Sequence, residues 1–490
     1  MKTTTDMKTQ LTTIKITTSF WLPLVALMLA CHAASAQTIV QGNIGGTWTP
    51  AGNPYIAVDN CTVTSTLILQ PGVIFQIQSN LTITANGQLI QAVGTPTQRI
   101  TIQAFPPNPQ TWNMISLINA PGTNRFKYCD FQNANTAIWM GVYGNYAPAR
   151  TISPEIINCT FSNCVSQAIY GESRALGVFN QYCPQDTALN AFIKNCVFLN
   201  SSNGCVFKLF GDPSLAGCGG QCIGTGHANL EVMGNIFQNL TGTAFLMTVA
   251  SCAGNSQPIF VNNTVVNCRV GIDAVDPWDA RVQDNIFIGT TNAVKVSGSL
   301  SRAISYNNFF GNATNFTGLP AAYGQVLLAN RNGTPSDVLY NIFQNPIFVA
   351  TGDFHLQSSS PCVNAGTPDD AFVNMCVPPS AVTTNFPELG AYGGPDACNW
   401  LNVVPLLPAQ ASLSRSNNFL RLNWGAIPRS TYQIQYLPTN FNATAGTNRW
   451  LTNSTLTAVD RPVSVVVSPF PPTNNNTYYR IRSLGRTPGN

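Results

Sequence analysis

The densest group of ionisable side chains lies in a short stretch of a chain that is otherwise poor in charge. Asp273, Asp276 and Asp279 occur within seven residues, beside Trp278 and Arg281, whereas only 9% of the 490 residues are charged. A typical soluble domain carries about 25%. Gathered carboxylates are ligands that Ca²⁺ prefers, and paired carboxylates are what glycoside hydrolysis requires. This stretch is therefore the first candidate for chemistry.

Two functional interpretations and one structural interpretation of the stretch remain open. Calcium held by Asp273, Asp276 and Asp279 would suit uronate cleavage, with Lys295 or Arg281 as the base. A carboxylate pair would instead suit glycoside hydrolysis. In the structural interpretation, Asp276 begins a solvated turn and Asp273 pairs with Lys295 one coil away. On the functional interpretations, the catalytic candidates are Asp273, Asp276 and Lys295, and calcium is the candidate cofactor.

Catalytic signatures with fixed spacing are absent from the sequence. There is no phosphate loop, no Gly-x-Ser-x-Gly elbow, no His-Glu-x-x-His and no dinucleotide glycine fingerprint. The net charge of +4 has no basic cluster behind it, which argues against nucleic-acid binding. Any reaction must therefore use residues that the fold brings together.

A repeated motif predicts that fold. The pattern of an apolar residue, Asn or Cys, any residue, Phe, any residue and Asn recurs eight times, without a helical period. The Phe position falls at Phe131, Phe161, Phe198, Phe237, Val266, Phe287, Phe310 and Phe343. A unit this short cannot bury an apolar face alone and must stack on copies of itself. The sequence therefore predicts an all-β parallel solenoid.

Stacking at about 4.8 Å places each motif position over its equivalent in the next coil. The Phe residues should then form a ladder that fills the core. Two residues earlier, the predicted ladder reads Cys129, Cys159, Cys196, Asn235, Thr264, Asn285, Asn308 and Asn341. Stacked Asn amides can bond one another and buried turn backbone, and the cysteines of this ladder should be small buried apolar side chains.

The strand after each motif predicts an outer face. Alternation turns Ile138 and Met140 inward and Trp139 outward, and the same holds in later coils. The predicted outer face comprises Trp139, Tyr170, Lys208, Asp273 and Lys295. Aromatic surface mixed with charge is typical of a sugar-binding groove, and insertions at 171–190 and 210–228 should border it. The predicted substrate-binding residues are Trp139, Tyr170, Lys208, Trp278 and Arg281.

The N-terminus predicts export. Residues 1–36 combine early lysines, an apolar core at 20–30 and the small-residue site Ala34-Ser35-Ala36, as a secretory signal peptide does. We therefore expect a secreted protein that begins near Gln37 and has no transmembrane segment. Export to an oxidising compartment predicts disulfides, with a thiolate metal site as the alternative at Cys218 and Cys222, near Cys183, Cys205 and Cys252.

The order of these features resembles the secreted bacterial right-handed parallel β-helix proteins, the pectate-lyase-like group. The resemblance rests on residues 54–56, 67–72 and 94–95, then the stacked Asn-x-Phe coils, followed by residues 345–348, 353–356, 360–366 and 389–392. It implies a right-handed parallel β-helix over 37–400, with a cap at 37–60 and a closing segment that ends the stack at 353–394. That family includes polysaccharide lyases and glycosidases. Its closing segment usually carries Asp where this chain has Asn364, so a role of that Asp does not carry over.

After Trp400 the pattern changes. Residues 401–408 have the composition of a linker, and residues 409–490 alternate as antiparallel strands do. About eighty residues suit a small β-sandwich. This region resembles the fibronectin type III-like modules of secreted bacterial proteins.

Together these features predict a secreted, monomeric β-helix protein whose partner is a polysaccharide or cell-surface glycan. It would act on that partner along the outer face as a polysaccharide lyase or glycoside hydrolase. The alternative is a noncatalytic cell-surface or adhesion protein that uses the β-helix as a binding scaffold.

Overall fold

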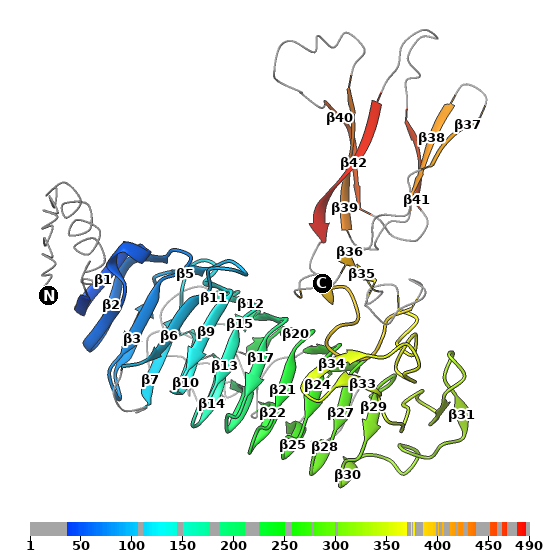
Figure 1. The fold of residues 1–490 in the computed structure, drawn as a ribbon, viewed down its shortest axis with the longest axis horizontal. Helices are drawn as coiled ribbons and strands as arrows, with labels where there is room; N and C mark the ends of the chain where they lie inside the picture. The colour runs from blue at the N-terminus through cyan, green and yellow to red at the C-terminus, as the bar shows by residue number, and fades with distance from the viewer. Residues whose placement is uncertain are drawn as a thin grey trace, which may run out of the picture.

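The computed structural model contains a long stack of parallel strands (Figure 1). It describes residues 37–369 apart from 106–110, 145–149, 176–185, 211–224, 250–256, 276–278 and 299–301, then 374, 386–397 and 400, and the backbone of strands at 376–377, 404–405 and within 412–486. The described residues contain no α-helix, and Pro50–Gly52 forms a 3-10 turn. No helix in this part of the chain is long and apolar enough to cross a membrane. The predicted leader, residues 1–36, lies outside the described residues.

Each coil contributes one strand to each of three parallel columns. The columns are called first, second and third in the order in which the chain passes through them. The first column contains β5 (Ile90–Val93), β8 (Arg125–Lys127), β12 (Glu155–Ile157), β16 (Phe192–Lys194), β20 (Glu231–Met233), β23 (Ile259–Val261) and β26 (Arg281–Gln283). The second contains β3 (Ile74–Ile77), β6 (Ile100–Ala104), β9 (Cys129–Gln132), β13 (Thr160–Ser162), β17 (Val197–Leu199), β21 (Ile236–Gln238), β24 (Thr264–Val266), β27 (Ile286–Ile288) and β29 (Asn308–Phe310). The third contains β4 (Thr82–Asn86), β7 (Trp112–Ile118), β10 (Ala134–Tyr143), β14 (Gln167–Arg174), β18 (Asn203–Phe210), β22 (Thr243–Val249), β25 (Val270–Val275), β28 (Asn292–Ser297) and β30 (Thr314–Thr317).

Further strands extend these columns. At the N-terminal end, β1 (Thr38–Trp48) runs parallel to β2 (Tyr55–Leu69), which pairs in turn with β3, β4 and β5. The region predicted as a cap therefore forms a coil of its own. In three coils, a further parallel sheet of β11 (Arg150–Ile152), β15 (Thr187–Leu189) and β19 (Gly226–Ala228) follows the third column.

The predicted Phe ladder is present in the second column. The register joins Phe131, Phe161, Phe198, Phe237, Val265, Phe287 and Phe309, and all are buried. Rings of Phe131 and Phe161 stack with centroids 4.7 Å apart. The predictions of Val266 and Phe310 were wrong by one residue. Two similar residues stand side by side in those coils, and a slip of one residue reverses the face to which a side chain points.

A ladder of buried amides lies beside the Phe ladder. Its members are Asn235, Asn263, Asn285, Asn307 and Asn341, so Asn263 and Asn307 replace the predicted Thr264 and Asn308. The Nδ2 of each donates to the Oδ1 of the next at 2.9 to 3.2 Å, and each Oδ1 also accepts a backbone N–H. Cys129, Cys159 and Cys196 fill the same position in the earlier coils.

The expectation of disulfides is not met in the described part of the chain. The eight cysteines whose side chains are described are buried free thiols. Seven of them lie in the solenoid and Cys362 lies in the strap, and all eight pack as small apolar side chains. Burial raises the pKa of Cys205 well above its ordinary value. Cys183, Cys218, Cys222 and Cys252 lie outside the described residues.

The segment expected to close the stack lies instead along its side. Here the strap denotes the described residues of 348–369 and 386–400, including the hairpin of β33 (Phe348–Ala350) and β34 (Asp353–Leu356) (Figure 1). Asn262 Nδ2 donates to Glu388 O at 2.9 Å, and Ala391 N donates to Thr264 Oγ1 at 2.9 Å. At the end of the stack, the core is covered by Phe316, Leu319, Tyr323 and Phe343.

The strap covers the corner between the first and second columns. At this corner, the chain turns through the left-handed region in successive coils, at Tyr128, Asn158, Asn195, Gly234, Asn262, Asp284, Tyr306 and Tyr340. Asn and Gly tolerate this conformation better than other residues. The turn leaves side chains of neighbouring coils aligned beneath the strap.

The C-terminal region contains the antiparallel strands that the sequence predicts. One sheet comprises β37 (Ser412–Ser416), β38 (Phe419–Trp424) and β41 (Val463–Val467), and the other comprises β39 (Ser430–Leu437), β40 (Leu451–Thr457) and β42 (Tyr478–Arg486). The fibronectin type III-like character of this region stays a prediction.

Candidate functional site

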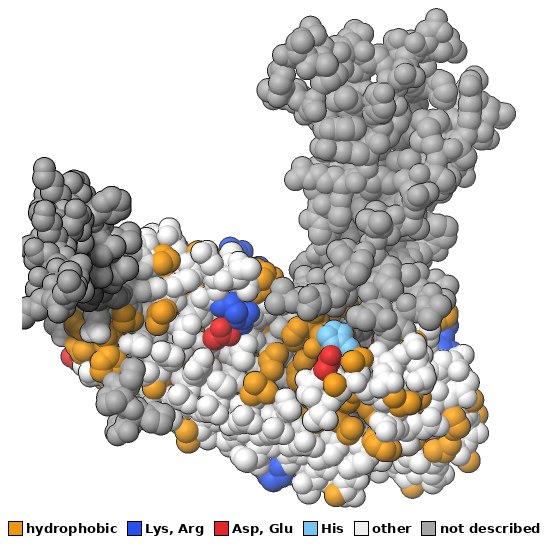
Figure 2. Space-filling model, in the orientation of Figure 1, with side chains coloured by type: hydrophobic (Ala, Val, Ile, Leu, Met, Phe, Trp, Pro, Cys, Tyr) orange, Lys and Arg blue, Asp and Glu red, His pale blue; other side chains and the backbone are white. Residues whose placement is uncertain are grey.

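The outer surface of the third column, called here the open face, carries most of the predicted binding residues. The register aligns Trp139, Tyr170, Val206, Leu246, Asp273 and Lys295 in one row. Lys208 lies two residues further along its strand, in register with Glu172. Residues two apart on a strand face the same way, so alternation alone does not distinguish these two rows. Figure 2 shows the side of the molecule on which the strap lies, where the side chains are mostly uncharged.

An aromatic cluster occupies the N-terminal part of the open face. It comprises Trp139, Tyr143, Tyr170, Glu172 and Lys208. The rings of Trp139 and Tyr170 stack with centroids 6.0 Å apart and planes 6° apart. The hydroxyls of Tyr143 and Tyr170 donate to the two carboxylate oxygens of Glu172, at 2.5 and 2.9 Å. Lys208 Nζ lies 5.8 Å from the centre of the Tyr170 ring.

Gly141 forms the floor between two of these rings. A Cβ added here would lie 2.8 Å from the Tyr143 ring and 2.9 Å from the Trp139 ring. No real Cβ tolerates such contacts, so both rings depend on the missing side chain to lie against the backbone. The arrangement is therefore specific to glycine at this position.

The electrostatics of the cluster keep both phenols protonated. Burial and the neighbouring Glu172 raise the pKa of Tyr143 and that of Tyr170 well above their ordinary value. Both hydroxyls therefore donate to Glu172 and orient its carboxylate. Sequence reasoning missed Tyr143 and Glu172, although their even spacing from Trp139 and Tyr170 was a usable signal.

The C-terminal part of the open face has a different character. Lys295 Nζ lies 3.2 Å from Asp273 Oδ2, which is the ion pair that the structural interpretation predicts. Asp273 Oδ1 is buried without a hydrogen-bond partner among the described residues. Glu172 and Asp273 are three strand spacings apart, roughly 14 Å at about 4.8 Å each. Carboxylates that hydrolyse glycosides together lie about 5 to 9.5 Å apart, so these two do not form such a pair.

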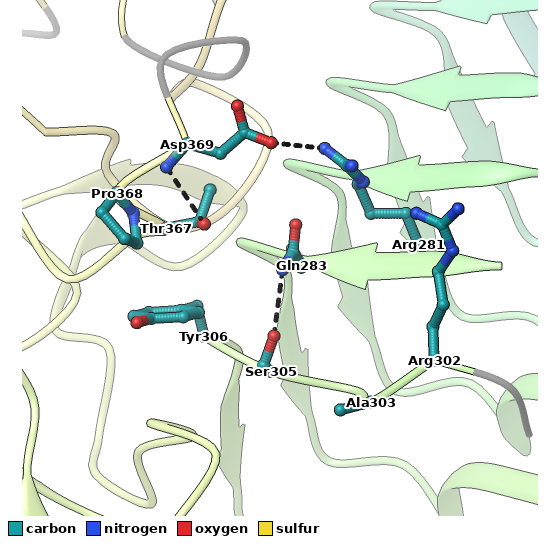
Figure 3. Close-up of a pocket in the computed structure, with 9 residues that line it drawn as sticks. All are labelled: Arg281, Gln283, Arg302, Ala303, Ser305, Tyr306, Thr367, Pro368 and Asp369. Carbon is teal, nitrogen blue, oxygen red and sulfur yellow. Dashed lines mark hydrogen bonds and ion pairs between the residues drawn. The ribbon is translucent and has the colours of Figure 1, made fainter.

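The other members of the aspartate stretch lie around a corner. Asp279 accepts a hydrogen bond from Arg302 Nε at 2.6 Å, and Arg281 Nη1 lies 2.6 Å from Asp369 Oδ2 of the strap (Figure 3). The chain leaves the third column after β25 and enters the first at β26, so Asp273 and Asp279 belong to different faces. Asp276 and Trp278 lie outside the described residues. Within the described residues, no group of three His, Cys, Asp or Glu could hold a metal ion.

Arg281 lines a pocket of about 490 Å³ between the first column and the strap. Gln283 Nε2 donates to Ser305 Oγ at 3.0 Å, and Figure 3 shows the side-chain oxygen of Gln283 pointing toward the space between Asp369 and Arg281. Both arginines of this pocket, Arg281 and Arg302, are paired with carboxylates. Arg281 therefore joins the strap to the solenoid rather than facing the open face, where substrate binding was predicted.

Comparison with known proteins supports the architecture. The model of the family described as the right-handed β-helix region matches residues 113–310, from β7 to β29. No curated protein matches the chain. The match and the parallel columns together identify residues 113–310 as a right-handed parallel β-helix region.

Proposed function

We propose that this protein binds an extended polysaccharide or cell-surface glycan across the strands of the open face. The observation that carries the proposal is the stacked pair of Trp139 and Tyr170 beside the oriented carboxylate of Glu172. Aromatic rings offer an apolar surface to the face of a sugar ring. Glu172 and Lys208 supply an acceptor and a donor for its hydroxyls. The β-helix fold, which often serves carbohydrate-active proteins, is consistent with this use.

The dimensions of the cluster favour a polymer. It spans β10, β14 and β18, which is two strand spacings or about 10 Å along the solenoid axis. The row continues beyond it through Val206, Leu246 and Asp273 without a change of column. A chain laid along the axis would therefore meet the aromatic cluster at one end and the ion pair further along.

Lyase or hydrolase chemistry on this face, with Asp273, Asp276 and Lys295 as its residues, is one form of the proposal. The second form is a noncatalytic binding or adhesion protein. The ion pair between Asp273 and Lys295, and the separation of Glu172 from Asp273, favour this second form. Export through the predicted leader and a monomeric state belong to both forms, and an attachment role for the C-terminal strands belongs to the second form.

The test is a panel of uronate-containing and neutral polysaccharides. The purified full-length chain is electrophoresed through gels that contain each polymer, and cleavage is followed separately by product sizing with and without calcium. We expect retardation by at least one polymer. Trp139→Ala should reduce that retardation, whereas Leu246→Ala, in the same row, should leave most of it. Cleavage would establish the catalytic form, and absence of both binding and cleavage across the panel would overturn the proposal.

A further inference from the structure

A second pocket, called here the corner pocket, lies at the edge of the strap and away from the open face. It has a volume of about 240 Å³. The solenoid contributes Arg99, Tyr128 and Asn195, and the strap contributes His355, Tyr392 and Trp400. Tyr128 and Asn195 are corner residues of the left-handed turn described above.

The strap side of the corner pocket is a continuous aromatic wall. The His355 and Tyr392 rings stack with centroids 3.6 Å apart, and the Trp400 ring lies 5.1 Å from Tyr392. Trp400 Nε1 donates to Ala391 O at 2.8 Å, which fixes the orientation of the indole. Apolar ring faces with a few placed polar groups are typical of small-molecule sites.

The charges at the corner pocket are compensated within the protein. Arg99 makes a two-pronged contact with Asp130, through Nε and Nη2 at 2.8 to 2.9 Å, and Nη2 also donates to Asn158 O. His355 Nδ1 lies 2.5 Å from Asp353 Oδ1. The pocket therefore offers no uncompensated charge to a ligand, in contrast to a site built to attract an anion or a cation.

Two polar atoms of the pocket residues have no partner among the described residues, Asn195 Oδ1 and His355 Nε2. Asn195 is only 1% exposed, and its Nδ2 donates to Asp396 O at 3.0 Å, which assigns Oδ1 as the unpaired acceptor. Against the effect of burial, hydrogen bonds from His355 hold the pKa of Asp353 below its ordinary value. A carboxylate at Nδ1 places a proton there, so Nε2 accepts a hydrogen bond when the ring is neutral and donates one when the ring is protonated.

We propose that the corner pocket binds one neutral sugar ring. Its apolar face would pack on the wall of Tyr392 and Trp400. After a small movement of the pocket wall, its hydroxyls would donate to Asn195 Oδ1 and hydrogen-bond with His355 Nε2, which are both buried in this structure. The volume lies below the range of about 300 to 1,000 Å³ for drug-sized ligands, which suits a single ring rather than a chain. This site is separate from the open face, so the chain would hold a glycan at two places.

The histidine content makes a direct test practical. The chain has three histidines, His32, His227 and His355, so ring-labelled histidine gives few signals. The full-length chain is labelled at the histidine ring nitrogens and titrated with the methyl glycosides of glucose, galactose and mannose. His355→Gln assigns the signal. We expect at least one glycoside to shift the His355 Nε2 resonance. The Nδ1 atom, which is bonded to Asp353, should stay protonated.

Variants separate the two sites. Trp400→Ala should weaken the titration about tenfold or more, whereas Trp139→Ala on the open face should leave it unchanged. If Trp400→Ala does not fold, Tyr128→Ala on the opposite wall replaces it. An unshifted His355 signal at saturating concentrations of all three glycosides would overturn this proposal, whatever the behaviour of the open face. Loss of the titration in Trp139→Ala would also overturn it, because the corner pocket would then not be the site.

Discussion

Two parts of the solenoid, called here its N-terminal and C-terminal halves, have the same coil geometry and differ in the side chains on the inside and outside of the coils. In the N-terminal coils, residues 125–210, the inner ladder is built of Cys129, Cys159 and Cys196, and the open face carries the aromatic cluster. In the C-terminal coils, residues 231–310, the inner ladder is built of asparagines, and the open face carries the Asp273 and Lys295 pair. The coil therefore fixes positions and leaves their chemistry to the individual side chains.

The inner ladders differ in how they are bonded. Each ladder asparagine accepts a backbone N–H and donates to the next amide, as Asn285 does toward Asn263 and Asn307. The thiols make only weak donor contacts, such as Cys159 Sγ to Phe126 O at 3.3 Å. We expect the C-terminal half to depend on buried hydrogen bonds and the N-terminal half on packing.

The largest effect should come from Asn285→Leu. It removes the acceptor of the Asn263 backbone N–H and the donor to Phe260 O, which leaves buried groups unpaired at about 1 to 3 kcal/mol each. We expect a loss of unfolding free energy of about 3 to 5 kcal/mol in urea titration. An effect below that of Cys159→Ala would contradict the distinction between the ladders.

A pH effect should arise where the strap lies against the C-terminal half. Burial raises the pKa of Glu388 from 4.5 to about 7, and that of Asp284 also rises well above its ordinary value. The folded chain then holds more protons than the unfolded chain between these pH values, so stability falls as the pH rises from about 4.5 to about 7. The Glu388 contribution is up to about 3 kcal/mol. Urea midpoints at pH 5 and pH 8 measure it, and Glu388→Gln should reduce the difference between them.

Gly141→Ala tests the aromatic cluster on the open face of the N-terminal half. The added Cβ would displace the rings of Trp139 and Tyr143. We expect the apparent dissociation constant for a bound polysaccharide to rise about tenfold, which corresponds to about 1.4 kcal/mol. Affinity electrophoresis measures this, with Leu246→Ala, in the row of Trp139 further along the face, as the control variant. Unchanged binding in Gly141→Ala would mean that these two rings do not take part in recognition of the polysaccharide.

Among the two ladder variants, the smaller effect should come from Cys159→Ala. The exchange removes one sulfur from a packed ladder and leaves no strong hydrogen-bonding group without its partner. We expect a loss of about 1 to 2 kcal/mol in urea titration. A loss comparable to that of Asn285→Leu would mean that the thiols contribute more than packing.

Much of the fold can be predicted from the sequence because the repeat reflects the physical requirement that coils stack on one another. Phe161 and Phe198 recur at equivalent positions because stacked coils need similar side chains to fill their core. The outward positions of Trp139 and Tyr170 follow from simple alternation. The register at Val265 and Phe309 could not be settled where two similar residues adjoin. The path of the strap could not be predicted either, because it depends on contacts such as Asn262 to Glu388, between residues far apart in sequence.

The candidate site was predicted less completely. The local density of aspartates drew attention to Asp273, whose charge is compensated by Lys295 one coil away. Glu172 carried no comparable density of charge: its only signal was the even spacing from Tyr170, and its contact with Tyr143 arises only when β10 and β14 are paired. Disulfides were expected from the predicted compartment, but the eight cysteines whose side chains are described are buried free thiols.

The most direct test compares the two ends of the open face in one experiment. The double variant Trp139→Ala, Tyr170→Ala and the double variant Asp273→Asn, Lys295→Met are measured by affinity electrophoresis in the polysaccharide that retards the wild-type chain most. We predict that the first loses affinity by about tenfold or more and that the second changes it less than about twofold. Full retention of binding by the first, or a loss confined to the second, would contradict recognition at the aromatic cluster.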